Sequence, residues 1–256
     1  MRFENFSKVI HIFTKKLSVT EVFSDGFVDM HNHLLPGLDD GAKTTEDSLK
    51  MLSLYADLNI QKIIATPHTM QGVWDNTPQS IEKAFNVLKK ATSDYGFKNM
   101  ELGYASEYMM DEGFMYWLSE KKLLTLKDNL ILVEMSYFHP PLNLKDILFE
   151  IQLQGYKPVL AHPERYIFYQ QNLKDLMDLK NAGCLFQLNL LSLTPHYGEA
   201  TQNTALSLLE KGCYDFLGTD AHKTAHLAKI KSIDKAKITE KLVPLIKNNL
   251  QLAVNQ

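Results

Sequence analysis

The chain has 256 residues, of which 45% are hydrophobic and 22% are charged, and its formal net charge is −3. That balance excludes a general nucleic-acid binder, which needs a basic surplus to offset phosphate. The two cysteines, Cys184 and Cys213, exclude a disulfide framework. No apolar run approaches the roughly 20 residues that cross a bilayer, and lysines interrupt the amino-terminal stretch where a signal peptide would be apolar. We therefore expect a soluble, cytoplasmic protein.

Strand-like and helix-like segments alternate in chain order. Short apolar runs predict buried strands at 26–30, 62–66, 101–106, 130–133, 158–161, 184–190 and 214–218. Apolar residues spaced three and four apart predict helices at 45–58, 78–88, 143–154, 173–182, 199–211 and 239–254. Thr44 precedes acidic residues that suit the positive end of a helix, and Thr77 precedes a proline at the first helical position.

This alternation predicts the fold class. Strands that alternate with helices form a parallel sheet, and seven or eight such units can close into a barrel of about 250 residues. No linker rich in proline, glycine or serine divides the chain. We therefore expect one α/β domain over 26–256, a distorted (β/α)7 barrel, preceded by an extension over 1–25.

Polar side chains gather at the ends of the predicted strands. They are His31, His33, His68, Glu107, Glu134, His162, Asp220 and His222, with Asp40 in the loop after the first strand. In a β/α barrel the carboxyl ends of the strands share one face, where active sites are built. The two histidines 31 and 33 are two residues apart, so an extended backbone points both the same way. We expect all nine side chains to meet at this face.

Five imidazoles and four carboxylates need a partner if they are packed together, because carboxylates repel and desolvated charges are costly. Histidine nitrogen and carboxylate oxygen suit zinc, manganese and iron. Nine ligands exceed the need of one ion, and are about right for two or three ions with a bridging carboxylate. A lone His-x-His or Asp-x-His pair would be weak evidence, so the hypothesis depends on all nine falling at strand ends.

Arginine is scarce, since Arg2 and Arg165 are the only two in the chain. Arg165 follows His162 closely and would lie beside the ions, where a guanidinium can bind two phosphate oxygens at once. A salt bridge to a neighbour such as Glu164 is the structural alternative.

Five segments carry a specific resemblance to a known family. They are 29–43 (DMHNHLLPGLDDGAK), 65–68 (ATPH), 160–166 (LAHPERY), 187–189 (QLN) and 219–222 (TDAH). Together they resemble the PHP (polymerase and histidinol phosphatase) superfamily. Within it they are similar to the CpsB/CapC group, the bacterial metal-dependent tyrosine-protein phosphatases of capsule and exopolysaccharide operons. The DDGAK and HPERY motifs favour this group over other PHP branches.

The resemblance implies a trinuclear site, usually assigned to manganese, with iron or zinc as alternatives. One ion would be held by His31, His33, Glu107 and Asp220, a second by Glu107, Glu134 and His162, and a third by Asp40, His68 and His222. Arg165 would hold the substrate phosphate and would act in catalysis with Asp220 and His222.

The implied reaction is hydrolysis of phosphotyrosine in proteins. The implied partner is a membrane-associated bacterial tyrosine kinase that regulates capsular or exopolysaccharide synthesis and export. We expect metal-bound hydroxide to attack phosphorus in line, without a phosphoenzyme. A cysteine phosphatase is excluded, because that class needs an arginine six residues after its cysteine, where this chain has Leu190 and Thr219.

Two other functions stay open at the level of sequence. A small-molecule phosphatase of the same superfamily, acting on a compound such as histidinol phosphate or a nucleotide, would have a deep and lidded pocket. A phosphatase of proteins would have an open mouth. A non-catalytic module that docks on the kinase or the export machinery would show no metal-dependent turnover.

Two further segments suggest contacts. Residues 1–17 would present one apolar stripe flanked by basic residues if they were helical, and could lie on an anionic membrane or dock on a kinase. A helix packed on the barrel or a partly ordered tail is the alternative. Tyr137, Phe138 and Tyr166 could stack on a phosphotyrosine ring, and we count Tyr166 with Arg165 as substrate-binding. Ordinary loop packing would explain the same aromatic residues.

Overall fold

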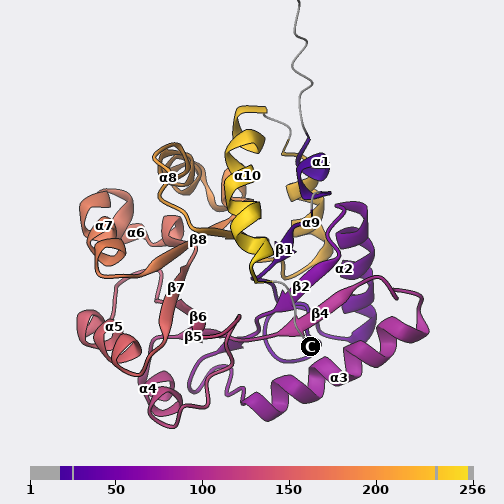
Figure 1. The fold of residues 1–256 in the computed structure, drawn as a ribbon, viewed down its shortest axis with the longest axis horizontal. Coiled ribbons are helices and arrows are strands. Elements are labelled where there is room, and N and C mark those ends of the chain that lie inside the picture. The colour runs from indigo at the N-terminus through magenta and orange to yellow at the C-terminus, as the bar shows by residue number, and fades with distance from the viewer. Residues whose placement is uncertain (1–17, 25, 234–235, 253–256) are drawn as a thin grey trace, which may run out of the picture.

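Short parallel strands form the centre of the computed structural model, which describes residues 18–24, 26–233 and 236–252 (Figure 1). They are β1 (Val28–Asp29), β2 (Lys62–Ala65), β3 (His68–Thr69), β4 (Glu101–Tyr104), β5 (Glu107–Met109), β6 (Leu130–Glu134), β7 (Lys157–Ala161), β8 (Leu185–Asn189) and β9 (Phe216–Gly218). All the pairings between these strands are parallel. Parallel neighbours require a connection that crosses back outside the sheet, and helices supply it here.

The strands follow one another around a curled sheet. One sheet has the order β1-β2-β4 and the other the order β3-β5-β6-β7-β8-β9. The segments β2 and β3 follow each other directly along the chain and occupy one strand position, and the same holds for β4 and β5. The nine strands therefore make seven positions, and the two sheets are parts of one ring. The ring is closed by a parallel bridge between Asn32 and Ala221, beside which the His33 N–H donates to the Ala221 carbonyl at 3.0 Å. The expected distorted barrel is confirmed.

Helices surround the strands (Figure 1). They are α1 (Val19–Phe23), α2 (Thr45–Asp57), α3 (Pro78–Asp94), α4 (Glu112–Ser119), α5 (Leu144–Leu153), α6 (Ile167–Gln170), α7 (Leu173–Asn181), α8 (Glu199–Glu210), α9 (Thr224–Lys231) and α10 (Ala236–Leu250), with 3-10 turns η1 (Pro163–Arg165), η2 (Leu190–Leu193) and η3 (Pro195–Tyr197). The predicted helix starts are confirmed. The hydroxyls of Thr44 and Thr77 accept hydrogen bonds from the main-chain N–H groups of Asp47 and Ser80, at 3.2 and 3.1 Å.

Some elements were not predicted. Helix α4 contains a glycine and several aromatic residues, which are poor signals of a helix. Helix α9 has its apolar residues spread among lysines and alanines. Helix α3 extends past residue 88 to Asp94. The expected apolar stripe over 1–17 lies outside the described residues.

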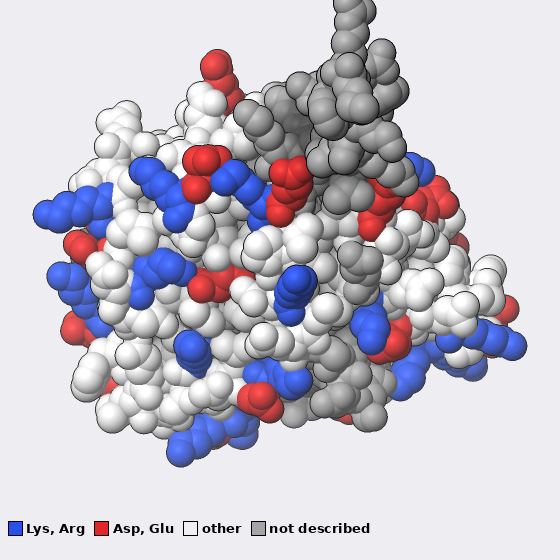
Figure 2. Space-filling model, turned by 45° about the horizontal axis from the view of Figure 1, so that its top comes forward, with Lys and Arg blue, Asp and Glu red and all other residues white. Residues whose placement is uncertain are grey.

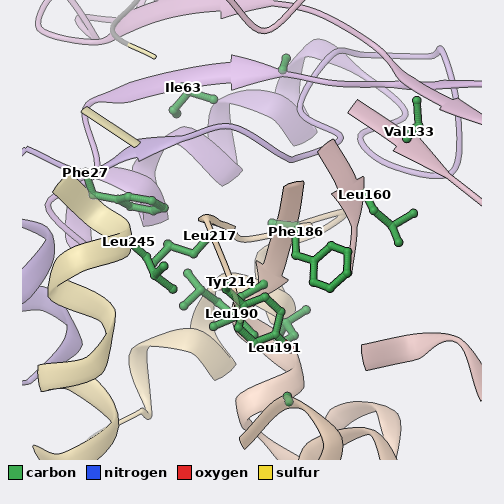
Figure 3. Packing of buried hydrophobic residues seen from close by; sticks show 14 of the residues in the cluster. Phe27, Ile63, Val133, Leu160, Phe186, Leu190, Leu191, Tyr214, Leu217 and Leu245 are labelled. Carbon is green, nitrogen blue, oxygen red and sulfur yellow. The ribbon is translucent and has the colours of Figure 1, made fainter. Parts of the chain in front are cut away.

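Buried apolar side chains form two clusters on opposite sides of the strands. The smaller cluster includes Val28, Ile64, Ala105, Leu132 and Val159. The larger cluster includes the alternate strand residues Ile63, Ile131, Leu160, Phe186 and Leu217, together with the apolar faces of the helices. Successive residues of a strand point to opposite faces, so the smaller cluster fills the barrel and the larger one lies between strands and helices. Figure 3 shows part of the larger cluster, with Leu217 of β9 beside Leu245 of α10.

The charged side chains of both signs are interspersed over the face shown in Figure 2. Among the helices that the structure describes, none combines the length and the apolar character needed to cross a membrane.

Candidate metal centre

The nine predicted side chains are supplied by loops and extensions at the carboxyl end of the barrel strands. His68 and Glu107 begin the extensions β3 and β5, and Glu134 ends β6. Ala105 and Leu132 belong to the cluster inside the barrel. Because side chains two residues apart point to the same face of a strand, Glu107 and Glu134 project above that apolar cluster. The side chains that face the barrel interior therefore change from apolar to charged within two residues of each strand.

Two of the strand ends are shaped by unusual backbone conformations. His162, after β7, has φ of 36°, and Asp220, after β9, has φ of 48°. Positive φ costs a residue other than glycine roughly 1–3 kcal/mol, and such positions are concentrated at functional sites. In each case the turn of the backbone ends the strand and directs the side chain into the cluster.

Glu107 lies at the centre of the cluster and is fully buried. Its Oε2 lies 3.1 Å from Nε2 of His31, 3.5 Å from Nε2 of His33 and 3.1 Å from Nδ1 of His68. Its Oε1 lies 3.1 Å from Nε2 of His162. One carboxylate thus touches four imidazoles, which is the arrangement expected of a bridging ligand.

Asp220 lies beside the same imidazoles. Its Oδ1 lies 3.5 Å from Nε2 of His31 and 3.2 Å from Nε2 of His33. The outer edge of the cluster is more exposed: Asp40 Oδ1 lies 3.3 Å from Nε2 of His222 and 3.6 Å from Nε2 of His68. Inside it, Nδ1 of His68 lies 2.8 Å from Glu134 Oε1. The structure therefore brings all nine predicted side chains together.

The nine residues form four overlapping groups with ligand atoms within 4.8 Å of one another. The groups are His33, Asp40, His68 and His222; His31, His33 and Asp220; His31, Glu107 and His162; and His68, Glu107 and Glu134. Shared members join the groups into one site. His31, His33, His68 and Glu107 each belong to more than one of these possible metal-binding groups.

The cluster fits a metal because its inward-facing atoms lack conventional partners. Within the described residues, no hydrogen bond is made by Nε2 of His31, Nε2 of His33, Nδ1 of His68, Nδ1 of His162 or Oε2 of Glu107, all of which are buried. Buried polar atoms are almost always hydrogen-bonded, so such a concentration needs an explanation. A divalent cation would satisfy the four of these atoms that face the cluster centre, and the donor set suits manganese, iron or zinc.

The acids and imidazoles of the cluster shift one another's pKa: burial alone would lower the pKa of His31 and His68, but the nearby carboxylates raise it. Burial alone would raise the pKa of Glu107, but His31 and His68 hold it well below its usual range. Burial and the charge of Glu107 raise the pKa of Glu134. Burial lowers the pKa of His162 to about 4, which leaves the neutral imidazole that a metal requires. Two carboxylates at such short range favour a site that carries added positive charge.

A second layer of side chains orients the histidines. Asp39 Oδ2 lies 2.8 Å from Nδ1 of His33, and the same carboxylate accepts a hydrogen bond from the Gly41 N–H at 2.8 Å. Gln187 Oε1 lies 2.9 Å from Nδ1 of His31. Each contact fixes one ring nitrogen and directs Nε2 into the cluster, as such partners do at metal sites. The sequence motifs include Asp39 and Gln187, but this role was not predicted.

Two glycines let the strands approach closely. A Cβ on Gly41 would lie 2.2 Å from the His33 carbonyl oxygen, and a Cβ on Gly218 would lie 2.7 Å from the Cβ of His31. Any side chain at these positions would displace a histidine of the cluster. The glycine of the DDGAK motif is therefore required for a steric reason, because no side chain fits at position 41.

Arg165 lies at the rim of the cluster, between two tyrosine rings. Its guanidinium carbon lies 4.5 Å from the ring centre of Tyr137 and 4.1 Å from that of Tyr197. Its Nη1 donates to Asp220 Oδ2 at 2.7 Å, and the Asn189 side-chain amide donates to the same oxygen at 2.7 Å. The structural alternative of a salt bridge is present, but its partner is Asp220 and not Glu164. Neither Tyr197 nor Asn189 was predicted.

Tyr166 does not fit its predicted contact with substrate. It is fully buried, and its hydroxyl donates to the Ala161 carbonyl at 3.0 Å and accepts from the Met135 N–H at 3.1 Å. Its hydrogen bonds hold β6 and β7 together beneath the rim. Tyr137, by contrast, is only partly buried and lies against Arg165.

Comparison with known proteins assigns the sequence of this barrel and its site to a family. The model of the family described as "Capsular polysaccharide synthesis, CpsB/CapC" matches residues 27–243. The chain belongs to this family. The match includes all nine cluster residues and Arg165.

Individual relatives agree with this placement. The chain is 32% identical to tyrosine-protein phosphatase YwqE of Bacillus subtilis over 201 residues, 76% of this chain and 77% of the relative. It is 25% identical to tyrosine-protein phosphatase CpsB of Streptococcus pneumoniae over 201 residues, 76% of this chain and 82% of the relative. A solved structure, reported among crystal structures of YwqE and CpsB as unique metal-dependent tyrosine phosphatases, matches with a TM-score of 0.77 and 28% identity, covering 90% of this chain and 96% of that chain.

Proposed function

We propose that this protein hydrolyses phosphotyrosine in proteins by a metal-dependent reaction. The observation that carries the proposal is the buried cluster around Glu107, whose inward-facing atoms lack hydrogen-bond partners within the described residues. Arg165, a fixed cation, borders that cluster. The similarity to YwqE and CpsB, both named as tyrosine-protein phosphatases, supports the substrate class.

Two or three divalent ions would be held by the nine cluster residues, and manganese is the metal that we propose. Glu107 would lie between ions because it touches the histidines of two groups. Asp40 and His222 would hold the outermost ion, because they form the exposed edge of the cluster. Bound ions of this kind lower the pKa of water toward about 7 and neutralise phosphate oxygens.

Arg165 would bind the phosphate of the substrate. A guanidinium has five N–H groups in a rigid plane, and the bond to Asp220 uses only part of them. The rings of Tyr137 and Tyr197 both lie against the guanidinium and would help to hold it in position. The negative charge that develops on phosphate would therefore meet a donor already in place, which is the main source of stabilisation at such sites.

The leaving group favours phosphotyrosine over an alkyl phosphate. A tyrosine phenolate has a pKa near 10 in water, so it needs less help from a general acid than a serine alkoxide does. We assign no residue as general acid. Asp220 and His222 would act through the cluster, with Asp220 also orienting Arg165.

The family description links the protein to capsular polysaccharide synthesis. We propose that its substrate is the phosphorylated tyrosine segment of a membrane-associated bacterial kinase that regulates this synthesis. The protein would meet that segment in the cytoplasm.

The test is phosphate release from a phosphotyrosine peptide by metal-stripped protein, with and without Mn²⁺. Three variants accompany it: His33→Ala, Arg165→Ala, and His139→Ala as a control, since His139 is an exposed histidine outside the cluster. Metal content is measured in each. We expect Mn²⁺ to restore turnover, His33→Ala to lose metal and turnover, and Arg165→Ala to keep metal while turnover falls by at least about 100-fold.

Undiminished turnover with all metal removed would overturn the proposal. So would full activity of His33→Ala. Metal binding without turnover of the peptide would instead direct the search to a small phosphate ester, with histidinol phosphate as the next compound.

A further inference from the structure

Two pockets adjoin the metal cluster, and they carry opposite charge. The first, here called the lysine pocket, has a volume of about 320 Å³ and is lined by Lys43, Lys50 and Lys223 together with His222 of the cluster. Asp47 is the acidic side chain in its wall. The lysines come from α2 and from the loops after β1 and β9. An anionic group would be attracted here.

The second, here called the acidic pocket, has a volume of about 440 Å³ and lies between the loop after β3 and the start of α4. Its carboxylates are Asp75, Asp111 and Glu112, and its aromatic walls are Trp74, Tyr116 and Trp117. No lysine or arginine lines it among the described residues. Aromatic faces beside carboxylates favour a cationic side chain, because both attract positive charge.

Each pocket lies beside a member of the group His33, Asp40, His68 and His222. His222 itself lines the lysine pocket. Trp74, which lines the acidic pocket, stacks on His68 with ring centres 4.7 Å apart and an interplanar angle of 11°. The rings of His68 and His222 are 5.9 Å apart. A phosphate bound at the cluster would therefore have one pocket within reach on the His222 side and the other on the His68 side.

Two of the carboxylates of the acidic pocket have main-chain partners, and the charged groups of the lysine pocket are partly engaged by neighbouring groups. Asp111 caps α4 by accepting from the Phe114 N–H at 2.8 Å, and Asp75 accepts from the Gly72 N–H at 2.7 Å. These are bonds to neutral main-chain groups. Within the described residues no lysine or arginine forms an ion pair with Asp75, Asp111 or Glu112. In the lysine pocket, Lys43 Nζ donates to the Asp39 carbonyl at 2.6 Å, and the largely exposed Lys50 lies 3.8 Å from Asp47. No ion pair of Lys223 is found within the described residues.

We propose that the two pockets select phosphotyrosine segments by their charge asymmetry. The lysine pocket would take an aspartate or glutamate on one side of the phosphotyrosine, and the acidic pocket a lysine or arginine on the other. An extended peptide advances about 3.3 Å per residue, and we take the three residues on each side of the phosphotyrosine as the positions to vary. The inference rests on the proposed phosphatase function. It adds that the peptide chain of the substrate crosses the site in one preferred orientation.

The test compares peptides of identical composition in the presence of Mn²⁺. In one set a glutamate precedes the phosphotyrosine and a lysine follows it, at one, two or three residues on each side. In the other set the two are exchanged. We expect one order to have a kcat/KM about fivefold higher than its mirror, since an exposed ion pair contributes up to about 1 kcal/mol.

Variants assign the preference to the pockets. Glu112→Lys and Lys50→Glu should each reduce the ratio between the two peptide sets, and the double variant should invert it. Glu112→Gln guards against an effect on the start of α4. Glu210→Lys is the matched control: Glu210 ends α8, at the opposite end of the barrel from the cluster, and is 73% exposed. Thermal unfolding shows that each variant is folded.

The outcomes separate the two proposals. Equal kcat/KM for both sets, or a ratio that Glu112→Lys and Lys50→Glu leave unchanged, would overturn the role of the pockets while the phosphatase function stands. Failure to hydrolyse any peptide with Mn²⁺ bound would overturn the proposed function, and this inference with it.

Discussion

The two ends of the barrel strands differ sharply in chemistry although only a few residues separate them. The interior of the barrel is filled by apolar side chains such as Val28, Leu132 and Val159, all fully buried. At the carboxyl end, Glu107 and His162 are equally buried but charged or polar. A buried leucine contributes about 1.5–3 kcal/mol, whereas a cluster of buried charges costs free energy unless it is paired. The apolar interior thus contributes to the stability of the fold, whereas the residues at the carboxyl ends of the strands form the candidate site.

The largest expected effect comes from Glu107→Gln. The substitution keeps the shape of the side chain but removes the charge that four imidazoles share. We expect kcat/KM on a phosphotyrosine peptide to fall by at least about 100-fold, because such a change weakens the cluster and the metal together. Metal content per chain, measured beside activity, should fall as well. Retention of both would contradict the central position of Glu107.

Leu132→Ala tests the apolar layer inside the barrel next to the cluster, since Leu132 pairs in register with Glu107. We expect the free energy of unfolding in urea to fall by about 3 kcal/mol, because a fully buried leucine would leave a cavity. Activity per folded molecule at 25 °C should stay near that of the original protein. A loss of activity as large as that of Glu107→Gln would show that the apolar layer and the cluster are not separable.

Tyr197→Ala tests the clamp on Arg165, by which we mean the two tyrosine rings, Tyr137 and Tyr197, that lie against its guanidinium. Loss of one stacked ring should raise KM for the peptide about fivefold, with kcat changing less, since a cation–π contact of this kind is worth about 1 kcal/mol. Tyr197→Phe keeps the ring and is the matched control, which should stay within about twofold of the original protein. Equal effects of both substitutions would assign the role to the hydroxyl instead.

The smallest expected effect is that of iodoacetamide, which should leave the phosphatase activity unchanged. Both cysteines are buried, and burial raises the pKa of Cys184 to about 12. A thiol in that state is a poor nucleophile at neutral pH. Inactivation that follows alkylation, measured by mass spectrometry, would contradict a mechanism without cysteine.

Eight of the nine cluster residues were predictable because they lie at or just past a strand end, and Asp40 because the loop that contains it follows the first strand. The partners that orient them were not. Asp39 lies in a loop, and Gln187 lies inside a strand with alternate neighbours in the core, so neither position signals a function. Only the fold places Asp39 against His33 and Gln187 against His31.

The surroundings of Arg165 were the hardest part to predict. Tyr137 follows β6 and Tyr197 ends η3 after β8, while Arg165 itself ends η1 after β7. Three separate connections must meet before the clamp exists. Tyr166, adjacent to Arg165 in sequence, points instead into the protein, because the turn at His162 reorients the chain. Proximity in sequence was a poor guide here.

The closure of the barrel sets an order of events during synthesis of the chain. Thr219 and Asp29 are 190 residues apart, yet the Thr219 N–H donates to Asp29 at 2.8 Å just below the cluster. Asp220 and His222 leave the ribosome long after His31 and His33. A nascent chain or a fragment ending before residue 219 therefore lacks one wall of the site. If the proposed ions bind at this site, their capture would depend on completion of the barrel, and metal loading would distinguish finished molecules from partial ones.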